Sequence, residues 1–282
     1  MKELDLTQGS VPKVLLHFAV PFLLANVLQA LYGGADLFVV GQYDDAASVA
    51  AVAIGSQVMQ TVTGVILGLT TGITVLIGIA TGAKDDRKTA SIVGTGIWLF
   101  AVVAAVLTAL MVALHGQIAV WMHTPVEAMR DTEAYLWICS MGIPFIIGYN
   151  VVCGILRGLG DSRTPLYFVA LACVLNIVLD FILVGACGMR AAGAAAATVT
   201  AQGVSFATAF GFLYRKGFHF EFTRRDIRPV RALCRQMTLL GAPIALQDLL
   251  VNLSFLLITV IVNGMGVVAS AALGVVEKLI VF

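Results

Sequence analysis

Long apolar segments make up most of the chain, and polar residues gather between them. Mostly apolar runs cover residues 14–41, 50–80, 91–115, 134–156, 166–187, 192–214 and 241–263, and an eighth begins near residue 267. A helix needs about 20 such residues to cross the hydrocarbon core of a bilayer. The runs lack the alternation of apolar and polar residues that is typical of barrel strands. The pattern therefore predicts an all-α polytopic membrane protein.

The composition supports this fold class and excludes several others. Of the 282 residues, 60% are hydrophobic and 12% are charged, whereas soluble domains average about 25% charged residues. A soluble enzyme, a disordered protein and a nucleic-acid binder are therefore excluded. The five cysteines form no CxxC pair, and we interpret them as small apolar residues. No HExxH, Walker or GxSxG motif suggests an enzyme.

Basic residues are concentrated in alternate connections between the predicted spans. The N-terminus and the second, fourth and sixth connections hold 14 Lys and Arg residues, whereas the connections on the opposite side hold only Arg130 and Arg190. Because cytoplasmic loops are enriched in Lys and Arg, we expect the N-terminus to be cytoplasmic. The longest basic connection, 215–236, is interpreted as a cytoplasmic loop, with a lipid or nucleotide site as the alternative.

A weak internal repeat predicts two lobes. Phe18-Ala-Val-Pro21 and Leu240-Gly-Ala-Pro243 each precede a long apolar run, and their prolines are 222 residues apart. Six spans precede the second copy, so both copies run in the same direction, as in parallel-repeat transporters. We expect a six-helix lobe over 1–214, the loop 215–236, and the first helices of a second lobe over 237–282. The chain would then be part of a protein of about twelve helices.

Polar residues inside the apolar runs are the main functional candidates. A charged side chain at mid-bilayer costs about 2.5–3.5 kcal/mol on translocon scales, so it is rarely placed there without a function. Several of these residues share a helical face at steps of three or four. They predict a water-accessible cation site, although the polar groups could instead only join helices by hydrogen bonds. By run they are Asn26, Gln29, Tyr32 and Asp36 in the first, Asn150 in the fourth, Asn176 and Asp180 in the fifth, and Thr198 and Gln202 in the sixth.

One connection carries a recognisable motif. Gly154-Ile-Leu-Arg-Gly-Leu-Gly-Asp-Ser-Arg-Thr-Pro165 resembles the fourth-to-fifth loop of the multidrug and toxic compound extrusion (MATE) family. The proline-containing first span with Asp36, and the Asn176 and Asp180 pair, are also similar to that family. The resemblance implies a secondary transporter in a prokaryotic inner membrane, which exchanges H⁺ or Na⁺ for organic, often cationic, drugs. It implies no cofactor besides the coupling ion, contact with membrane lipids, and a functional monomer at full length.

The resemblance also implies roles for single residues. The residues expected to couple transport to the ion are Asp36, Asn176, Asp180, Thr198 and Asn150. If the ion is Na⁺, its ligands would be Asp36, Asn176, Asp180 and Thr198. The substrate cavity is expected to include Asn26, Gln29, Tyr32 and Gln202.

Two further features refine this resemblance. Val251 stands where some branches carry an acidic residue, which favours the DNA-damage-inducible-type branch and leaves the role of Asp248 open. A lipid-linked oligosaccharide flippase of the same superfamily is the alternative function. Flippases tend to carry cationic residues in the cavity, whereas no Lys or Arg lies in the middle of the first six spans.

Overall fold

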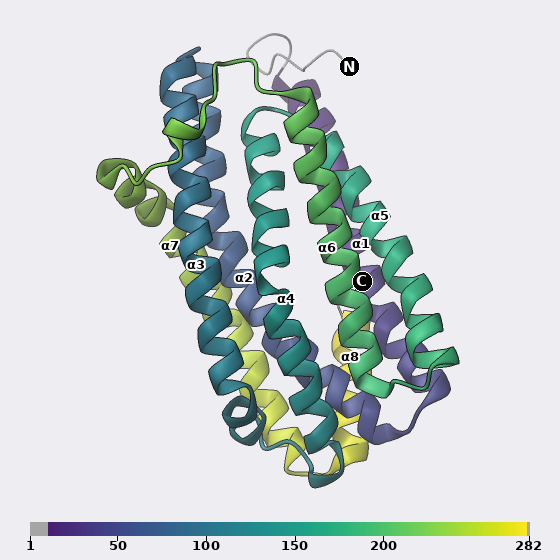
Figure 1. Cartoon of the computed structure of the whole chain (residues 1–282). Helices are drawn as coiled ribbons and strands as arrows, with labels where there is room; N and C mark the ends of the chain where they lie inside the picture. The colour runs from purple at the N-terminus through teal and green to yellow at the C-terminus, as the bar shows by residue number, and fades with distance from the viewer. Residues whose placement is uncertain (1–10, 281–282) are drawn as a thin grey trace.

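The computed structural model describes residues 11–280, which form long helices joined by short connections (Figure 1). Seven segments are long and apolar enough to cross a membrane, and the described residues contain no strand. The predicted all-α polytopic fold class is therefore confirmed. The elements are α1 (Val11–Tyr43), α2 (Ala46–Gly82), α3 (Asp86–Trp121), α4 (Val126–Gly158), α5 (Arg163–Asp180), the π-helix η1 (Phe181–Ala186), α6 (Arg190–Lys216), the 3-10 helix η2 (Arg224–Asp226), α7 (Arg231–Asn263) and α8 (Val267–Ile280).

Aspartates in the connections determine where two of the long helices begin. The Asp45 side chain accepts a hydrogen bond of 3.0 Å from the backbone N–H of Ser48, at the start of α2. Asp85 accepts the equivalent bond, also 3.0 Å, from the backbone N–H of Lys88 at the start of α3. Each carboxylate satisfies a backbone N–H that has no partner within its helix. The turns before α2 and α3 can therefore be very short.

Successive helices run in opposite directions, so the connections alternate between two ends of the molecule (Figure 1). The connections 83–85, 159–162 and 217–230 lie at the end where α1 begins, which we call the basic end. The connections 44–45, 122–125, 187–189 and 264–266 lie at the opposite end. The basic connections that the sequence predicts on one side of a membrane thus share one end of the fold.

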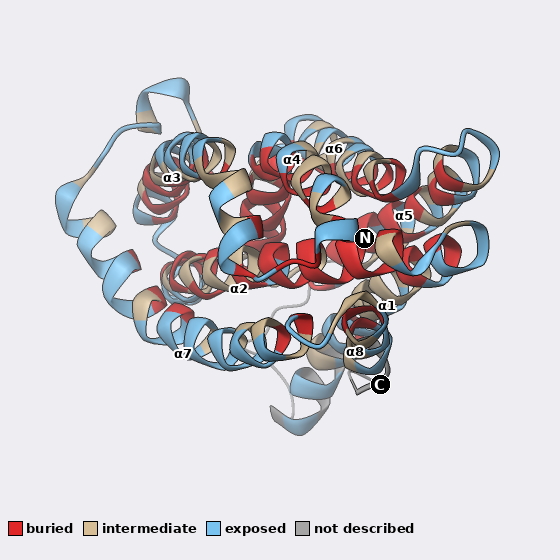
Figure 2. Cartoon of the chain, turned by 90° about the horizontal axis from the view of Figure 1, so that it is seen from below, coloured by how far each residue is buried: buried red, intermediate tan, exposed pale blue. Residues whose placement is uncertain are grey.

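Helix α4 forms the centre of the packing. It contacts α2, α3 and α6 along its length, and Figure 2 shows its buried residues between these helices. Leu136, Ile143, Ile147 and Ile155 are among its fully buried side chains. In a bilayer, close packing rather than escape from water holds such helices together.

Glycines allow α2 and α7 to approach closely. A Cβ atom added at Gly68 would collide with the backbone of Ala245, and one added at Gly72 would collide with the Met237 carbonyl. The spacing of Gly64, Gly68 and Gly72 is the small-residue pattern that permits such contact. Much of the remaining surface of α7 is exposed (Figure 2), including Leu250 and Ile261. An apolar surface of this kind suits lipid or another membrane segment rather than water.

Candidate ion and substrate site

Three helices bring four of the predicted ion-site residues together. Thr198 Oγ1 of α6 donates a hydrogen bond to Asp36 Oδ2 of α1 at 3.1 Å. Asn176 Nδ2 of α5 in turn donates to Thr198 Oγ1 at 3.3 Å. The carboxyl group of Asp180 lies close enough to that of Asp36 for the two side chains to interact electrostatically. We call Asp36, Asn176, Asp180 and Thr198 the carboxyl cluster.

The carboxyl cluster is buried and rich in acceptor oxygens. Asp36 is 4% exposed, Asn176 1% and Asp180 0%. Asn176 Oδ1 and both carboxyl oxygens of Asp180 receive no fixed N–H or O–H donor from the described residues. Two adjacent carboxylates in a low-dielectric interior repel each other, and an uncompensated buried charge is costly. The geometry therefore suits a positive charge between the two carboxyl groups, either a shared proton or a small cation.

The donor set of the cluster suits a hard cation as well as a proton. It offers two carboxylates, an amide oxygen and a hydroxyl oxygen, and oxygen ligands are those that hard cations prefer. Among the described residues, no group of three or more His, Cys, Asp or Glu side chains could hold a metal ion. With two carboxylates and two neutral oxygen groups, the cluster suits a singly charged ion, and either H⁺ or Na⁺ fits the prediction.

The backbone changes its helical form directly after Asp180. Asn176 and Asp180 lie one turn apart on the same face of α5, and the chain then continues as the π-helix η1 rather than as regular α-helix. Such wider turns are rare and frequently occur at functional sites. This element could not be predicted, because an apolar run carries no signal for the change from α-helix to π-helix.

A central cavity of about 370 Å³ opens beside the carboxyl cluster. Asp36 and Thr198 belong both to the cluster and to the cavity wall, so the ion site and the cavity share two side chains. Gln202 Nε2 lies 3.4 Å from the Tyr32 hydroxyl and links α6 to α1 across the cavity wall. The four residues predicted for the substrate cavity all line it: Asn26, Gln29, Tyr32 and Gln202.

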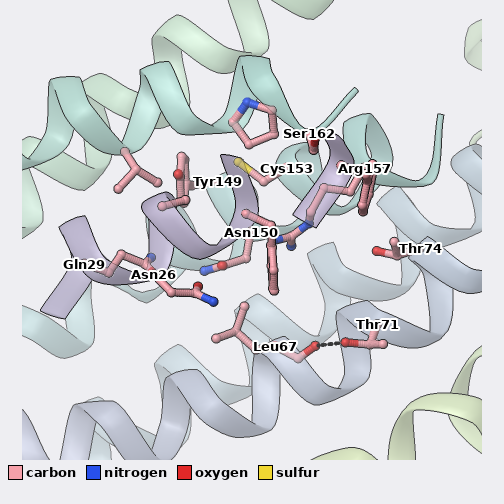
Figure 3. A pocket seen from close by; sticks show the side chains of 15 residues that line it. Asn26, Gln29, Leu67, Thr71, Thr74, Tyr149, Asn150, Cys153, Arg157 and Ser162 are labelled. Carbon is pink, nitrogen blue, oxygen red and sulfur yellow. Dashed lines mark hydrogen bonds between the residues drawn. The ribbon is translucent and has the colours of Figure 1, made fainter. Parts of the chain in front are cut away.

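A second cavity, also of about 370 Å³, lies toward the basic end (Figure 3). We call it the basic-end cavity. Four residues line both cavities and form a shared wall between them: Asn26, Gln29, Leu67 and Asn150. Asn150, predicted for the ion site, lies in this wall and lines the same cavity as Asp36. Its Nδ2 donates to the Ile146 carbonyl at 2.7 Å.

The central cavity is also lined by polar residues of α7 to which the sequence assigns no role. Asp248 and Asn252 of α7 line it opposite α1, and Asn252 Nδ2 donates to the Asp248 carbonyl at 2.8 Å. Gly64 of α2 lies against both side chains, where a larger residue would crowd them. An aspartate within an apolar span was a signal that could have placed Asp248 in the cavity.

A network of ion pairs lies at the end of the molecule opposite the basic end. Arg190 Nη2 lies 2.8 Å from Asp45 Oδ2, and Arg190 Nε lies 3.2 Å from Asp44 Oδ1. Arg190 Nη1 is 3.6 Å from Asp131 Oδ2, so one guanidinium joins the start of α6 to α4 and to the α1–α2 connection. The hydrogen bond from the Ser48 backbone N–H, helped by Arg190, lowers the pKa of Asp45 below its usual value.

Comparison with known proteins gives this architecture a family. The family model described as MatE matches residues 21–182, which is more than half of the chain and includes Asp36, Asn176 and Asp180. The chain belongs to the MATE family. Membership confirms the predicted resemblance and places the chain among transporters rather than enzymes.

Individual MATE relatives agree in sequence and in fold. The chain is 32% identical to the probable multidrug resistance protein YpnP of Bacillus subtilis, with 99% of this chain and 62% of YpnP covered. It is 24% identical to the multidrug export protein MepA of Staphylococcus saprophyticus, over 98% of this chain and 61% of MepA.

Solved structures support the same assignment. An outward-facing multidrug resistance MATE family transporter superposes with a TM-score of 0.82 at 26% identity, with 88% of this chain and 55% of that one covered. A MOP superfamily transporter from Pyrococcus furiosus superposes with a TM-score of 0.81 at 26% identity, with 88% and 56% covered. The chain thus spans about three fifths or less of the length of these relatives.

Proposed function

We propose that the complete gene product exports organic, often cationic, compounds across the cytoplasmic membrane in exchange for H⁺ or Na⁺. Two relatives of the chain, YpnP and MepA, are described as multidrug resistance and export proteins. The all-helical fold and the cavity beside a buried carboxyl pair support the same activity. The partners of the protein are then small organic molecules and membrane lipids, and it works as a monomer.

The position of Asp36 is the observation that carries this proposal. Asp36 is hydrogen-bonded within the carboxyl cluster and also lines the central cavity. A carboxylate in the cavity wall attracts an organic cation more strongly when it is charged than when it is neutral. Uptake of a proton or Na⁺ by the Asp36 and Asp180 pair removes that attraction. Ion and substrate then compete for Asp36, which is the requirement for exchange.

Each residue of the cluster has a distinct part in this exchange. Asp36 and Asp180 hold the proton or the sodium ion between their carboxyl groups. Thr198 orients Asp36 through its hydroxyl hydrogen bond, and Asn176 orients Thr198. Asn26, Gln29, Tyr32 and Gln202 provide polar groups around the substrate in the cavity, and Asn150 lies in the wall toward the basic end.

The membrane potential is a sufficient energy source for such exchange. Moving one charge through 100 mV supplies about 2.3 kcal/mol. Since 1.4 kcal/mol corresponds to a tenfold ratio, one net charge per cycle supports roughly a 40-fold substrate gradient. Export therefore needs no hydrolysis of a nucleotide.

The charge distribution supports an orientation for the chain. The basic end carries most of the Lys and Arg residues, so we place it and the N-terminus on the cytoplasmic side. Residues 1–214 would then form one lobe, 215–236 a basic cytoplasmic loop, and 237–282 the start of a second, parallel lobe.

Transport by the complete gene product in proteoliposomes tests the proposal. An imposed pH gradient or an imposed Na⁺ gradient should drive uptake of a cationic dye, and the gradient that succeeds identifies the ion. Asp36→Asn and Asp180→Asn keep the size of the side chains but cannot take up a proton, so each should abolish driven transport. Driven transport at the wild-type rate by either variant would overturn the assignment of the carboxyl pair.

A further inference from the structure

The two neighbouring cavities share part of their walls but are lined by side chains of opposite charge. Among the described residues that line the basic-end cavity, Arg157 is the only one with a charged side chain, and it is basic. The central cavity is lined instead by two acidic residues, Asp36 and Asp248. The cavities share a wall that includes Asn26 and Asn150. A molecule that extends past these shared residues, from one cavity into the other, would have one end beside a cation and the other end beside carboxylates.

The positive charge of Arg157 is held in place without being neutralised. Its guanidinium Cζ lies 5.4 Å from the centroid of the Phe22 ring of α1, and Figure 3 shows its side chain extending into the cavity. A cation–π contact orients a guanidinium and leaves its charge and most of its N–H donors available. Within the described part of the chain, no acidic side chain forms an ion pair with Arg157.

A structural role alone accounts for only part of this arrangement. Arg157 lies in the last turn of α4, where a basic residue complements the partial negative charge of the helix end. That role is satisfied by a side chain in solvent, and it does not require the guanidinium to enter a cavity.

The remaining walls of the basic-end cavity fit an amphiphilic molecule with an anionic group. Phe18, Phe22, Leu67 and Val169 provide an apolar surface. The side-chain amides of Asn26 and Gln29 are further hydrogen-bond donors facing this space (Figure 3). Ser162 and Pro165 bring the beginning of α5 to the cavity, and the start of a helix favours anions.

We infer that the basic-end cavity is an oxyanion site, in which Arg157 binds a carboxylate or phosphate group of an amphiphilic molecule. Arginine is suited to this role because its planar guanidinium can form two parallel hydrogen bonds with such a group. The oxyanion belongs either to a zwitterionic substrate, whose cationic group lies in the central cavity beside Asp36, or to a lipid headgroup. Binding of a zwitterionic substrate at this site rests on the proposed function, whereas binding of a lipid headgroup does not.

A pair of matched dyes tests this site in the complete gene product, reconstituted in phosphatidylcholine nanodiscs. A zwitterionic rhodamine and its methyl ester share the same aromatic cation and differ in the free carboxylate. Binding of each dye is measured by fluorescence polarisation for the wild type, Arg157→Gln and Arg157→Lys. Arg215→Gln is the control, because it removes a charge from an exposed residue at the basic end.

We expect Arg157→Gln to weaken binding of the zwitterionic dye roughly tenfold or more, which is typical of a lost hydrogen bond to a charged group. Binding of the ester should stay at the wild-type level. Arg157→Lys should retain part of the affinity, since it keeps the charge without the planar fork. Arg215→Gln should resemble the wild type for both dyes.

Addition of phosphatidylglycerol distinguishes the two sources of the oxyanion. Suppose that Arg157→Gln changes the binding of neither dye in phosphatidylcholine alone. If phosphatidylglycerol then displaces dye from the wild type but not from Arg157→Gln, the site is confirmed with the phosphate of an anionic lipid as its occupant. Unchanged binding of both dyes with no lipid effect, or an equal loss for both dyes, would overturn the inference. Asp36→Asn provides the separate reference for the proposed function, because it should weaken both dyes alike.

Discussion

The Thr198 hydroxyl group donates a hydrogen bond of 3.1 Å to the Asp36 carboxylate, although the two residues are 162 positions apart in the chain. This bond joins α6 to α1 at the point where the buried carboxyl cluster meets the central cavity. Since Asn176 donates to the same hydroxyl, the orientation of Asp36 depends on two other helices.

Thr198→Val tests the importance of this bond. Valine keeps the shape of the side chain but removes the donor to Asp36, and hydrogen bonds to charged groups contribute about 1.5–3 kcal/mol. We expect the concentration of the coupling ion that gives half-maximal transport to change roughly tenfold or more. Thr208→Val is the control, because Thr208 is exposed on the same helix and donates only to the Val204 carbonyl. Equal ion dependence of Thr198→Val and wild type would show that the bond has no part in ion binding.

The positions of the cluster residues could be predicted from the sequence because charge in an apolar span is unusual. Asp36 and Asp180 were identifiable in this way, and the one-turn spacing of Asn176 and Asp180 fixed their common face. The contact of Thr198 with Asp36 depends on how α1, α5 and α6 pack, which the pattern within a single helix does not contain. The predicted division into two lobes stays a prediction.

Other features could not be predicted for equally physical reasons. The π-helix after Asp180 depends on local hydrogen-bond geometry, and its apolar residues are compatible with either helical form. The position of Asn150 in the wall that the two cavities share depends on the rotation of α4. The position of Asp248 in the central cavity, where it faces Gly64 of α2, depends on how α2 and α7 pack.

Gly68→Ala should destabilise the contact between α2 and α7. The added methyl group would collide with the Ala245 backbone, which cannot move aside as a flexible side chain could. Overpacking of this kind typically costs about 1–3 kcal/mol, so the melting temperature in detergent should fall. Gly211→Ala is the matched control, since nothing lies within contact distance of an added Cβ there. Equal melting temperatures for the two variants would contradict the close α2–α7 packing.

Asp45 should stabilise the start of α2 in a pH-dependent way. Its pKa is lowered from the usual 3.8, chiefly by the hydrogen bond from the Ser48 backbone N–H. A carboxyl group with a lowered pKa in the folded state adds stability above its unfolded pKa and loses it as the pH falls through the folded value. Asp45→Ala should therefore cost about 0.5–1 kcal/mol near neutral pH and progressively less below about pH 4.

Thermal melting of wild type and Asp45→Ala across this pH range measures the effect. Asp45→Asn serves as the control, because asparagine retains an acceptor for the Ser48 N–H but cannot titrate, so its stability relative to Asp45→Ala should not depend on pH in this range. A stability difference between wild type and Asp45→Ala that does not shrink in acid would argue against a charged cap.

Labelling of a native cysteine tests the proposed orientation. Cys187 is exposed in the α5–α6 connection, at the end opposite the basic end. A membrane-impermeant maleimide added to intact cells should therefore label the wild type but not Cys187→Ser. A cysteine introduced by Arg225→Cys in the Cys187→Ser background should be labelled only after the cells are made permeable. The reverse pattern would place the basic end outside.

Competition between ion and substrate at Asp36 is the central claim, and substrate affinity measured against pH and Na⁺ concentration tests it most directly. For the wild-type complete gene product, the Kd of a cationic dye should rise as protons or Na⁺ fill the carboxyl pair. For Asp36→Asn, the dye should bind more weakly, and its Kd should no longer depend on the coupling ion. An Asp36→Asn protein whose dye affinity varies with pH or Na⁺ as the wild type does would contradict the claim.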